Sequence, residues 1–545
     1  MSNSTPLGRM EQVDLREVWL SPNNAPLIDK RAFGCRQVAA EQELTTTKGL
    51  KIMMTGCSQQ LTLWDLGPQQ VTVTFQGGRI VSDAGLLGIR KLDKGLGVLS
   101  LLAERLPDPR TQSLVVHSRE TLFTQQVYQI LAGYPDCNDA QTLRNDPLFH
   151  TLLDLPAEED AKPLASGSTL ARFAQAYTRR DGELPLEERP VLLEVAAAQN
   201  QRLKILNDYL PELFIRTRRA RPACIILDID ASDDPTHGQQ VLSFYHGYYE
   251  QNQYFPLYVF DGTTGFPLAA WLRPGTVHAS CGAIDTLKAI IDPLRRAWPG
   301  ITILVRGDGG FAVPAVYEFC EAEGLLYAFG YSTNAVLTRR TDAIAADLET
   351  YYHFYGERDP HVQRFEVFED YQASEWTRPR RIVAKVEINR QGINRRFVVT
   401  NMSGHPQGLY QGFYVQRGAV PEQPIGELKN GLLADRLSFH HFRANSWKLL
   451  EHVMAFALVI LHREATAAIP EIAKAQVNTL RTKLWKVGAI VKTSVRRIWF
   501  HFSETWPHQN LWQRVYAAIV EFVAQVQQAR QGNLTTPGTP APLLM

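Results

Sequence analysis

The chain has 545 residues, of which 45% are hydrophobic and 21% are charged, and its formal net charge is +1. This is the composition of an ordinary soluble globular protein, and the length predicts about three or four domains. A net charge this close to zero does not by itself indicate a nucleic-acid-binding protein.

The cysteines and the apolar runs exclude several classes of protein. The six cysteines are scattered without a Cys-x-x-Cys pair, which argues against a disulfide framework or a zinc site and favours a reducing compartment. The longest strongly apolar run, 454–461, is far too short to cross a bilayer. The N-terminus carries no signal-peptide pattern. We therefore expect a cytoplasmic protein with no membrane partner.

The N-terminal part is predicted to be an arm followed by helices. Residues 1–65 show weak periodicity, so we expect a partly disordered arm. The stretch QQVTVTFQGGRIVSD, 69–83, alternates apolar and polar residues around a Gly-Gly pair and predicts a hairpin. SGSTLARFAQAY, 166–177, is typical of a capped helix. We expect 66–210 to be a mostly helical DNA-binding domain, although a plain helical bundle would show the same pattern.

The middle of the chain predicts an α/β core. The near-continuous apolar run ACIILDID, 223–230, indicates a strand buried on both faces. Further strands are expected at 241–249, as a pair within 255–272, and at 301–308 and 325–331, with helices at 283–298 and 313–324. This order favours a ribonuclease-H-like core, although several α/β folds share parts of it. We assign its first part to 211–335 and its second part to 403–465.

The remaining segments are predicted to be an insertion and a basic C-terminal region. Strand-like stretches at 364–371, 380–388 and 395–401 predict a β-rich insertion over 336–402. Residues 445–465 predict a strongly apolar helix. Residues 466–532 are expected to be helical and basic, and the Pro- and Thr-rich tail, 533–545, to be disordered. Basic residues with tryptophans among them can bind phosphates, but a solvated helix face would look the same.

Two carboxylates are expected at the ends of neighbouring strands. Asp230 ends the first buried strand and Asp308 ends the strand 301–308. Open α/β sheets place their sites at such carboxyl ends, and close carboxylates repel unless a cation lies between them. Mg²⁺ or Mn²⁺ suits these oxygen ligands, and two such ions support phosphodiester chemistry. A turn or cap role is the simpler interpretation of a lone Asp308. Asp228 points to the same face as Asp230, so the choice between them stays open.

A third acid is expected beyond the insertion, in YVQRGAVPEQPIGELKN, 414–430. Glu422 could complete a metal site there, while Arg417 and Lys429 could hold DNA phosphates. Alternatively, the stretch is only the exposed start of an amphipathic helix.

Several blocks together resemble insertion-sequence DDE transposases, most closely the IS-thirteen-eighty family. The matching blocks are LDIDASDDPTHGQQ, LAAWLRPG, ILVRGDGGFA, the Tyr-x-x-Arg-Gly stretch and ADRLSFHHFRAN, in the family's order. GYPDCNDAQTLRNDP and LASGSTLARF in the N-terminal part, and KTSVRRIWF near the end, resemble it too. The resemblance covers about residues 65–510, and the combination of blocks is specific where each one alone is weak.

The resemblance implies a bacterial cut-and-paste transposase whose Asp-Asp-Glu triad binds two Mg²⁺ ions, with Mn²⁺ as an alternative. Carried over by motif, the triad is Asp230, Asp308 and Glu422, and Asp230 is preferred to Asp228 because Asp-Ala-Ser matches the family's Asp-x-Ser/Thr. The implied partners are the terminal inverted repeats of the element and target DNA. A homodimer in the synaptic complex and association with the nucleoid follow from the same resemblance.

The related Tyr-Arg-Glu-Lys signature falls on Tyr414, Arg417, Glu422 and Lys429, with one departure. The signature has three residues between its Arg and Glu, whereas this chain has four, with Pro421 as the extra residue. Proline is tolerated only in the first turn of a helix, so Glu422 is expected near a helix start. Glu427 is the alternative third acid.

Further DNA contacts are expected from two basic segments. In related transposases an aromatic residue of the insertion stacks on a flipped base, and Trp376 is the candidate here, with Arg378, Arg380 and Arg381 beside it for phosphates. A tryptophan packed on its own sheet is the alternative. Near the C-terminus, Arg496 and Arg497 are the DNA-binding candidates.

Two other functions fit the same sequence. One is a catalytically inactive relative that only binds terminal repeats. The other is a ribonuclease-H-like nuclease that cuts DNA but never joins a 3′-OH to a target.

Overall fold

The computed structural model describes residues 60–176 except 109 and 159, residues 201–419 and 422–532, and two short strands, β1 (Leu44–Thr45) and β2 (Lys51–Ile52). Most of the arm expected at 1–65 and the whole tail expected at 533–545 lie outside the described residues. The chain divides into two compact units, Met1–Gly77 and Gly78–Met545. The domain boundaries expected from the sequence stay predictions.

The first unit contains a hairpin, but not the predicted one. Strand β4 (Gln69–Thr74) pairs with the preceding strand β3 (Gln60–Leu66), and Gly67 in the turn has a φ of +60°. A glycine adopts this left-handed conformation without steric cost, which explains why the chain turns there. The prediction of a hairpin over 69–83 is wrong, because the next strand, β5 (Ile80–Val81), pairs with a strand near the C-terminus.

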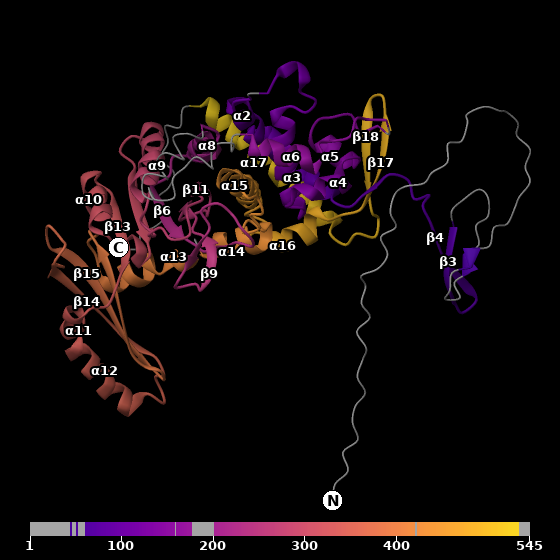
Figure 1. Ribbon diagram of the computed structural model, residues 1–545. Helices are drawn as coiled ribbons and strands as arrows, with labels where there is room; N and C mark the ends of the chain where they lie inside the picture. The colour runs from indigo at the N-terminus through magenta and orange to yellow at the C-terminus, as the bar shows by residue number, and fades with distance from the viewer. Residues whose placement is uncertain are drawn as a thin grey trace, which may run out of the picture. The chain divides into compact units, whose positions relative to one another are not determined.

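The second unit is built on an eight-stranded mixed sheet, seen with its flanking helices in Figure 1. The strand order is β11-β10-β6-β12-β13-β16-β15-β14, and only β6–β12 and β12–β13 are parallel pairs. The strands are β6 (Cys224–Ala231), β10 (Leu257–Asp261), β11 (Pro267–Trp271), β12 (Thr302–Gly307), β13 (Leu326–Tyr331), β14 (Val362–Tyr371), β15 (Arg380–Asn389) and β16 (Gly392–Thr400). Successive residues of the two central strands β6 and β12 are buried, so both faces of these strands are covered, which explains their mostly apolar sequences.

The predicted β-rich insertion is an extension of this sheet. Strand β16 pairs with β13, so β14, β15 and β16 continue the core instead of forming a separate layer. The segment before them is helical, with α11 (Ala335–Arg340) and α12 (Asp342–Tyr355). Ala345 and Leu348 of α12 pack on Val386 and Ile388 of β15, which explains the hydrophobic residues of both segments.

The stretch 241–249 is not a core strand. It contributes only β8 (Phe244–His246), which pairs with β9 (Gln251–Tyr254) in a small sheet completed by β7 (Asp234–Pro235). Leu242 and Glu250 on either side of β8 have positive φ, so the chain turns sharply at both ends. The pair expected within 255–272 is correct and forms β10 and β11.

A buried helix joins the sheet to the helical parts. Helix α15 (Phe442–Ala465) packs on β11 and on helices from both ends of the chain, including α3 (Arg119–Ala132), α8 (Gln201–Thr217) and α17 (Gln509–Gln531). It is the one described helix that is long and apolar enough to cross a membrane, and its most apolar window is entirely buried. Core packing therefore accounts for its apolar sequence.

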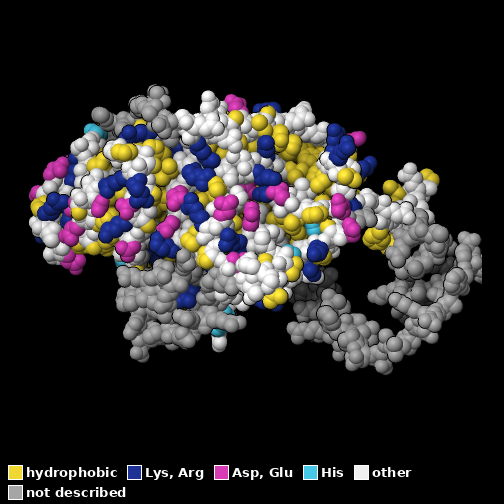
Figure 2. All heavy atoms as spheres, turned by 90° about the horizontal axis from the view of Figure 1, so that it is seen from above, with side chains coloured by type: hydrophobic (Ala, Val, Ile, Leu, Met, Phe, Trp, Pro, Cys, Tyr) yellow, Lys and Arg dark blue, Asp and Glu magenta, His cyan; other side chains and the backbone are white. Residues whose placement is uncertain are grey.

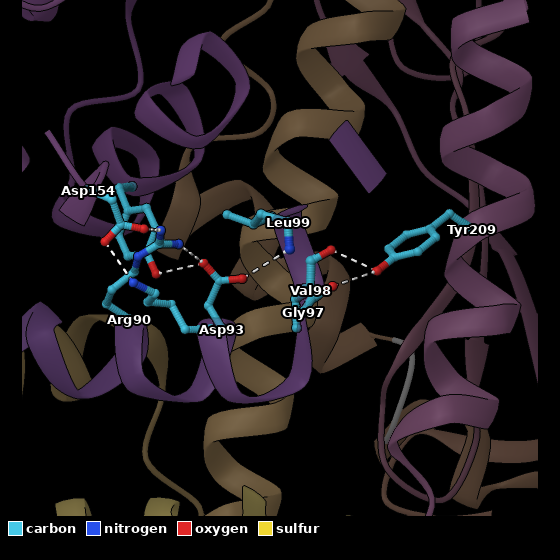
Figure 3. A network of polar contacts seen from close by, with 9 residues as sticks. Arg90, Asp93, Gly97, Val98, Leu99, Asp154 and Tyr209 are labelled. Carbon is cyan, nitrogen blue, oxygen red and sulfur yellow. Dashed lines mark hydrogen bonds and ion pairs between the residues drawn. The ribbon is translucent and has the colours of Figure 1, made fainter. Parts of the chain in front are cut away.

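A polar network ties the N-terminal helices to helix α8 (Figure 3). Asp93, buried in α1 (Leu87–Leu96), accepts hydrogen bonds from Arg90 and from the backbone N–H of Leu99 at 3.0 Å. Tyr209 of α8 donates to the carbonyl of Val98, at the start of α2 (Val98–Arg105), at 2.8 Å. The network joins α1 and α2 to α8, and α8 in turn packs on β11 of the sheet.

The basic C-terminal region is only partly helical. Strands β17 (Ala489–Ser494) and β18 (Arg497–Phe502) form a hairpin where we expected helix. The segment alternates β-branched residues with polar ones, which suits a strand. In the chain, the short helix α16 (Val477–Leu480) precedes this hairpin and the long helix α17 follows it.

Candidate active site

Asp230 and Asp308 stand at the same level of two adjacent parallel strands. The register pairs Gly307 of β12 with Ile229 of β6, so the next residue on each strand is one of the two aspartates. Asp230 is 7% exposed and Asp308 is partly exposed. The expectation that the two carboxylates come together at the carboxyl ends of these strands agrees with this register.

Tyr249 lies within electrostatic reach of both carboxylates. Burial raises the pKa of its phenol, and the carboxylates of Asp233, Asp230 and Asp308 raise it further. This tyrosine lies in the turn between β8 and β9 of the small sheet, so that turn lies near the two carboxylates. A neutral phenol there can donate a hydrogen bond without adding charge.

Asp308 lies in a glycine-rich turn that the packing requires. It precedes a 3₁₀ turn, Gly309–Phe311, and its Oδ1 accepts a hydrogen bond from the backbone N–H of Gly310 at 2.9 Å. A side chain at Gly310 would come within 2.6 Å of Ala279 Cβ, and one at Gly330 within 2.5 Å of the Tyr414 hydroxyl. Asp308 therefore does cap this turn, but the cap uses only one lone pair of its carboxylate, and the remaining lone pairs can accept further bonds.

Asp228 is held in a different arrangement from Asp230. Its two oxygens accept from Nε and Nη2 of Arg306 at 2.6 and 2.7 Å, and both side chains are almost fully buried. Arg306 also donates to the carbonyl of Phe413 at 2.7 Å. Burial raises the pKa of Asp228, and the Arg306 guanidinium opposes that rise. With both oxygens bound to Arg306, Asp228 is a structural residue here and Asp230 is the better candidate ligand.

A π-helix brings the Tyr-Arg pair to the site. It spans Gly408–Tyr414 and is followed by α13 (Gln416–Ala419). Arg417 Nη1 donates to Asp230 Oδ2 at 3.2 Å. Burial raises the pKa of Tyr414; Arg417 opposes the rise and Asp308 adds to it. Both expected DNA contacts therefore lie beside the two aspartates.

Helix α14 (Glu422–Leu432) begins at the expected third acid, as the neighbouring prolines predict. The backbone of Glu422 is described, but its side chain and Pro421 are outside the described part of the chain. Glu427, the alternative acid, is 5% exposed, pairs with Arg463, and accepts from the backbone N–H of Val477 at 3.0 Å. Its carboxylate is thus occupied in joining α14 to α16.

Lys429, seven residues after Glu422 in α14, pairs with Asp233 at 2.9 Å. Burial is the largest single effect and raises the pKa of Asp233, but the hydrogen bond and the charge of Lys429, together with a hydrogen bond from Gln251, lower that pKa overall. Because Asp233 follows β6 by two residues, this ion pair fixes α14 beside the strand that carries Asp230.

A polar pocket of about 470 Å³ opens beside Asp308. It lies at the carboxyl end of β13, against the part of β16 that extends beyond its pairing with β13. Its lining includes Asp308, Tyr414 and three arginines, Arg395, Arg396 and Arg417. Arg417 pairs with Asp230, and Arg395 pairs with Asp342 at 2.9 Å, so a phosphodiester in this pocket would compete with these carboxylates for the guanidinium groups.

The other expected DNA contacts are placed differently. Trp376 is 5% exposed, and its ring packs edge-on against Tyr317, Tyr331 and Tyr371. Arg380 forms a two-point contact with Glu321 at 2.8 and 2.9 Å. Arg378, which is more exposed, pairs with the same glutamate at 2.6 Å. A base could stack on Trp376 only if this aromatic cluster opened.

Arg496 and Arg497 lie apart from these residues, in the β17–β18 hairpin. Two other basic residues of the same region have structural partners. Lys486 pairs with Asp83 at 3.0 Å, Arg481 donates to the backbone carbonyls of Leu131 and Gly431, and Trp485 between them is buried.

Sequence reasoning missed two groups of residues. Arg306 is two residues before Asp308, so it points to the same face, and this spacing could have paired it with Asp228. Arg395 and Arg396 were treated only as part of a strand. Their role in the pocket depends on β16 joining β13, which no local pattern indicates.

The donor atoms of the site suit a divalent cation, although no complete set of ligands is described. Asp230 and Asp308 provide hard carboxylate oxygens, and Asp230 already binds a cationic group, Arg417. Among the described side chains, no three His, Cys, Asp or Glu residues are grouped closely enough to hold a metal ion. On the face seen in Figure 2, Lys and Arg side chains are interspersed with Asp and Glu, as the small net charge predicts.

The model of a family described as "Transposase DDE domain group 1" matches residues 65–524. Among solved structures, a piggyBac transposase in a synaptic complex with hairpin DNA is similar with a TM-score of 0.36 and 11% identity, over 85% of this chain and 87% of that one. No curated protein matches the sequence.

Proposed function

This chain belongs to the transposase DDE domain group 1 family, and from that premise we propose that it is a metal-dependent DNA transposase that excises an element and joins it to a target. We further propose membership of the IS-thirteen-eighty family of bacterial insertion sequences, on the sequence blocks described above. The observation that carries the proposal is the register that puts Asp230 and Asp308 at one level of two parallel strands.

The strand order supports a ribonuclease-H-like core. In the order β11-β10-β6-β12-β13, the first three strands along the chain are antiparallel neighbours, and the last two add in parallel on the other side of β6. The candidate site lies outside the carboxyl ends of β6 and β12, as in other open α/β sheets. In this proposal β14, β15 and β16 enlarge the sheet beside the site.

Asp230, Asp308 and Glu422 would hold the divalent cations, Mg²⁺ or Mn²⁺. When bound, such ions activate a water or hydroxyl group and stabilise the charge that develops on the leaving oxygen. Arg417 would transfer from Asp230 to a DNA phosphate, because a phosphate accepts from the same guanidinium fork. Lys429 stays at Asp233, where it holds α14 and so positions Glu422.

The rest of the DNA strand is proposed to follow the polar pocket beside Asp308. The pocket's arginines would bind the phosphates next to the scissile bond, and Tyr414, with its raised pKa, would donate a hydrogen bond as a neutral phenol. Hydrolysis at the element end frees a 3′-OH, which then attacks the opposite strand or the target DNA. Paired element ends need paired active sites, so a homodimer would bring the terminal inverted repeats together.

An inactive terminal-repeat-binding relative is the second candidate, and one observation favours it. Arg417 bonds to Asp230, and this chain has one residue more than the signature between Arg417 and Glu422. Incubation with labelled element ends and Mg²⁺ separates the candidates. A transposase cuts the ends and joins them to a target plasmid, a nuclease cuts without joining, and an inactive relative binds without cutting.

A further inference from the structure

The β17–β18 hairpin is built like a ribbon whose tip is free. Strand β5 pairs only with Ala489 and Ile490 at the base of the hairpin, where Phe502 packs on Trp512 with ring centroids 5.1 Å apart. Beyond that base, the side chains from Ser494 to Trp499 are all exposed. Figure 1 shows the hairpin (yellow) at the margin of the helical part.

The outward face of this ribbon combines cations with an aromatic ring. The register places Lys492 opposite Trp499 and Ser494 opposite Arg497, and residues directly opposite one another share a face. Trp499 is 39% exposed. From Lys486 to Ser503 the sequence contains four basic residues and no acidic one. Within the part of the chain that the structure describes, Lys492, Arg496 and Arg497 form no ion pair.

The tip of the ribbon carries an exposed aliphatic side chain. Val495 is 101% exposed, and Arg496 and Arg497 follow it directly. Nothing in the described chain covers this side chain, and a fully exposed valine contributes little to folding. The distance along the strand from Lys492 to Val495 is roughly 10 Å, which compares with a depth of about 8.5 Å for the major groove of B-DNA.

We propose that the β17–β18 hairpin is a DNA-binding ribbon that enters the major groove of duplex DNA away from the candidate active site, with Val495 at the base edges. A two-stranded ribbon fits this groove, and Lys492, Arg496 and Arg497 are spaced to contact the phosphates on either side. The inference rests on the proposed function only in taking DNA as the ligand, because it involves none of the candidate metal ligands.

The test is equilibrium binding of the full-length chain to a 30-base-pair duplex of mixed sequence, with EDTA present so that metal-dependent chemistry does not contribute. Val495→Glu places a negative charge at the tip, and Val116→Glu, at another exposed valine (77%), is the matched control. We expect Val495→Glu to weaken binding about tenfold or more and Val116→Glu to change it less than threefold. Unchanged thermal unfolding would show that both variants are folded.

A second variant tests the phosphate contacts. Replacing Lys492, Arg496 and Arg497 together by Gln is expected to reduce the slope of log Kd against log salt by about two to three, whereas Gln at the exposed Arg358 and Arg390 is expected to leave it unchanged. Equal effects of the two sets, or wild-type binding by Val495→Glu, would overturn the inference. So would equally tight binding of single-stranded DNA with the same hairpin dependence, because that indicates base stacking on Trp499 and not groove entry.

The outcomes also separate this inference from the proposed function. Hairpin-dependent duplex binding by a protein that never cuts DNA would refute the transposase proposal and leave the hairpin inference intact. Cleavage of element ends by the hairpin variants at the wild-type rate and affinity would support the transposase proposal and refute the hairpin inference. A wild-type protein that binds no DNA would refute both.

Discussion

Asp228 and Arg306 form a two-point ion pair between the central parallel strands β6 and β12, with Arg306 Nε 2.6 Å from Asp228 Oδ1. The exposed fractions of the two side chains are 0% and 2%. The same arginine donates to the carbonyl of Phe413, at the end of the π-helix that leads to Tyr414 and Arg417. This pair therefore connects the strand of Asp230, the strand of Asp308 and the segment of Arg417.

Breaking this pair is expected to destabilise the whole protein. Asp228→Asn leaves a buried guanidinium without its counter-charge, and such changes cost about 3–5 kcal/mol. Urea unfolding followed by circular dichroism measures the loss. The control is Asp370→Asn, which breaks the exposed Arg340–Asp370 pair and should leave the midpoint nearly unchanged. An unchanged midpoint for Asp228→Asn would contradict the structural role given to it.

Acid sensitivity is expected from His462 in helix α15. Burial, with a smaller contribution from the charge of Arg463, lowers the pKa of His462 from 6.5 to about 3. The unfolded chain therefore binds a proton that the folded chain does not, so this residue's contribution to stability is present above pH 6.5 and is lost progressively as the pH falls towards 3. Over that window the slope is about 1.4 kcal/mol per pH unit.

His462→Gln removes this proton linkage. The slope of unfolding free energy against pH between about pH 6 and pH 4 should fall by about 1.4 kcal/mol per pH unit, which corresponds to one proton. The control is His501→Gln, at an exposed histidine, which should keep the wild-type slope. An unaltered slope in His462→Gln would show that the histidine is protonated in the folded protein.

Trp376 and Trp499 should respond oppositely to substitution. Trp376 is buried among three tyrosine rings, so Trp376→Ala is expected to cost about 3–5 kcal/mol of stability. Trp499 lies on the outward face of the hairpin, so Trp499→Ala should reduce DNA affinity with little loss of stability. Denaturant unfolding and DNA titration on both variants decide between packing and DNA contact. Trp376→Ala with wild-type stability and lost cleavage would support the base-stacking role instead.

Arg417 is expected to compete with divalent cations for Asp230. In Arg417→Gln the two carboxylates lose their neighbouring positive charge, and only a cation relieves their repulsion. Mg²⁺ titration by calorimetry should give an affinity about tenfold tighter than that of the wild type, which corresponds to about 1.4 kcal/mol. Arg340→Gln, which breaks the Arg340–Asp370 pair outside the candidate site, is the control and should change the affinity less. Weaker Mg²⁺ binding by Arg417→Gln would indicate that Arg417 supports the metal site.

Much of the core could be predicted because its signals are local. The apolar runs of β6 and β12 end in Asp230 and Asp308, and parallel strands bring their carboxyl ends together. The choice between Asp228 and Asp230 could not be made locally, since both point to one face. That choice depends on Arg306, which lies opposite Asp228 on the adjacent strand β12 and binds it.

Other features depend on distant partners and were missed for that reason. Ile80 and Val81 pair with β17, more than four hundred residues later, so their alternation alone suggested a local hairpin. Trp376 is followed by arginines, which suggested DNA contact, but Glu321 binds both Arg378 and Arg380. Strands β14 to β16 were recognised as strands, yet only the β13–β16 pairing makes them part of the core sheet.

The most direct test of the central claim is excision in vitro from a plasmid that carries the element with its native ends, in the presence of Mg²⁺. Wild type, Asp308→Asn, Glu422→Gln and Glu427→Gln are compared, with binding to the ends measured for each. We expect excision by the wild type and by Glu427→Gln, whose carboxylate is engaged with Arg463, and bound but uncut DNA with the other two. Cleavage by Asp308→Asn at the wild-type rate would contradict the assignment of Asp308 to a catalytic metal site.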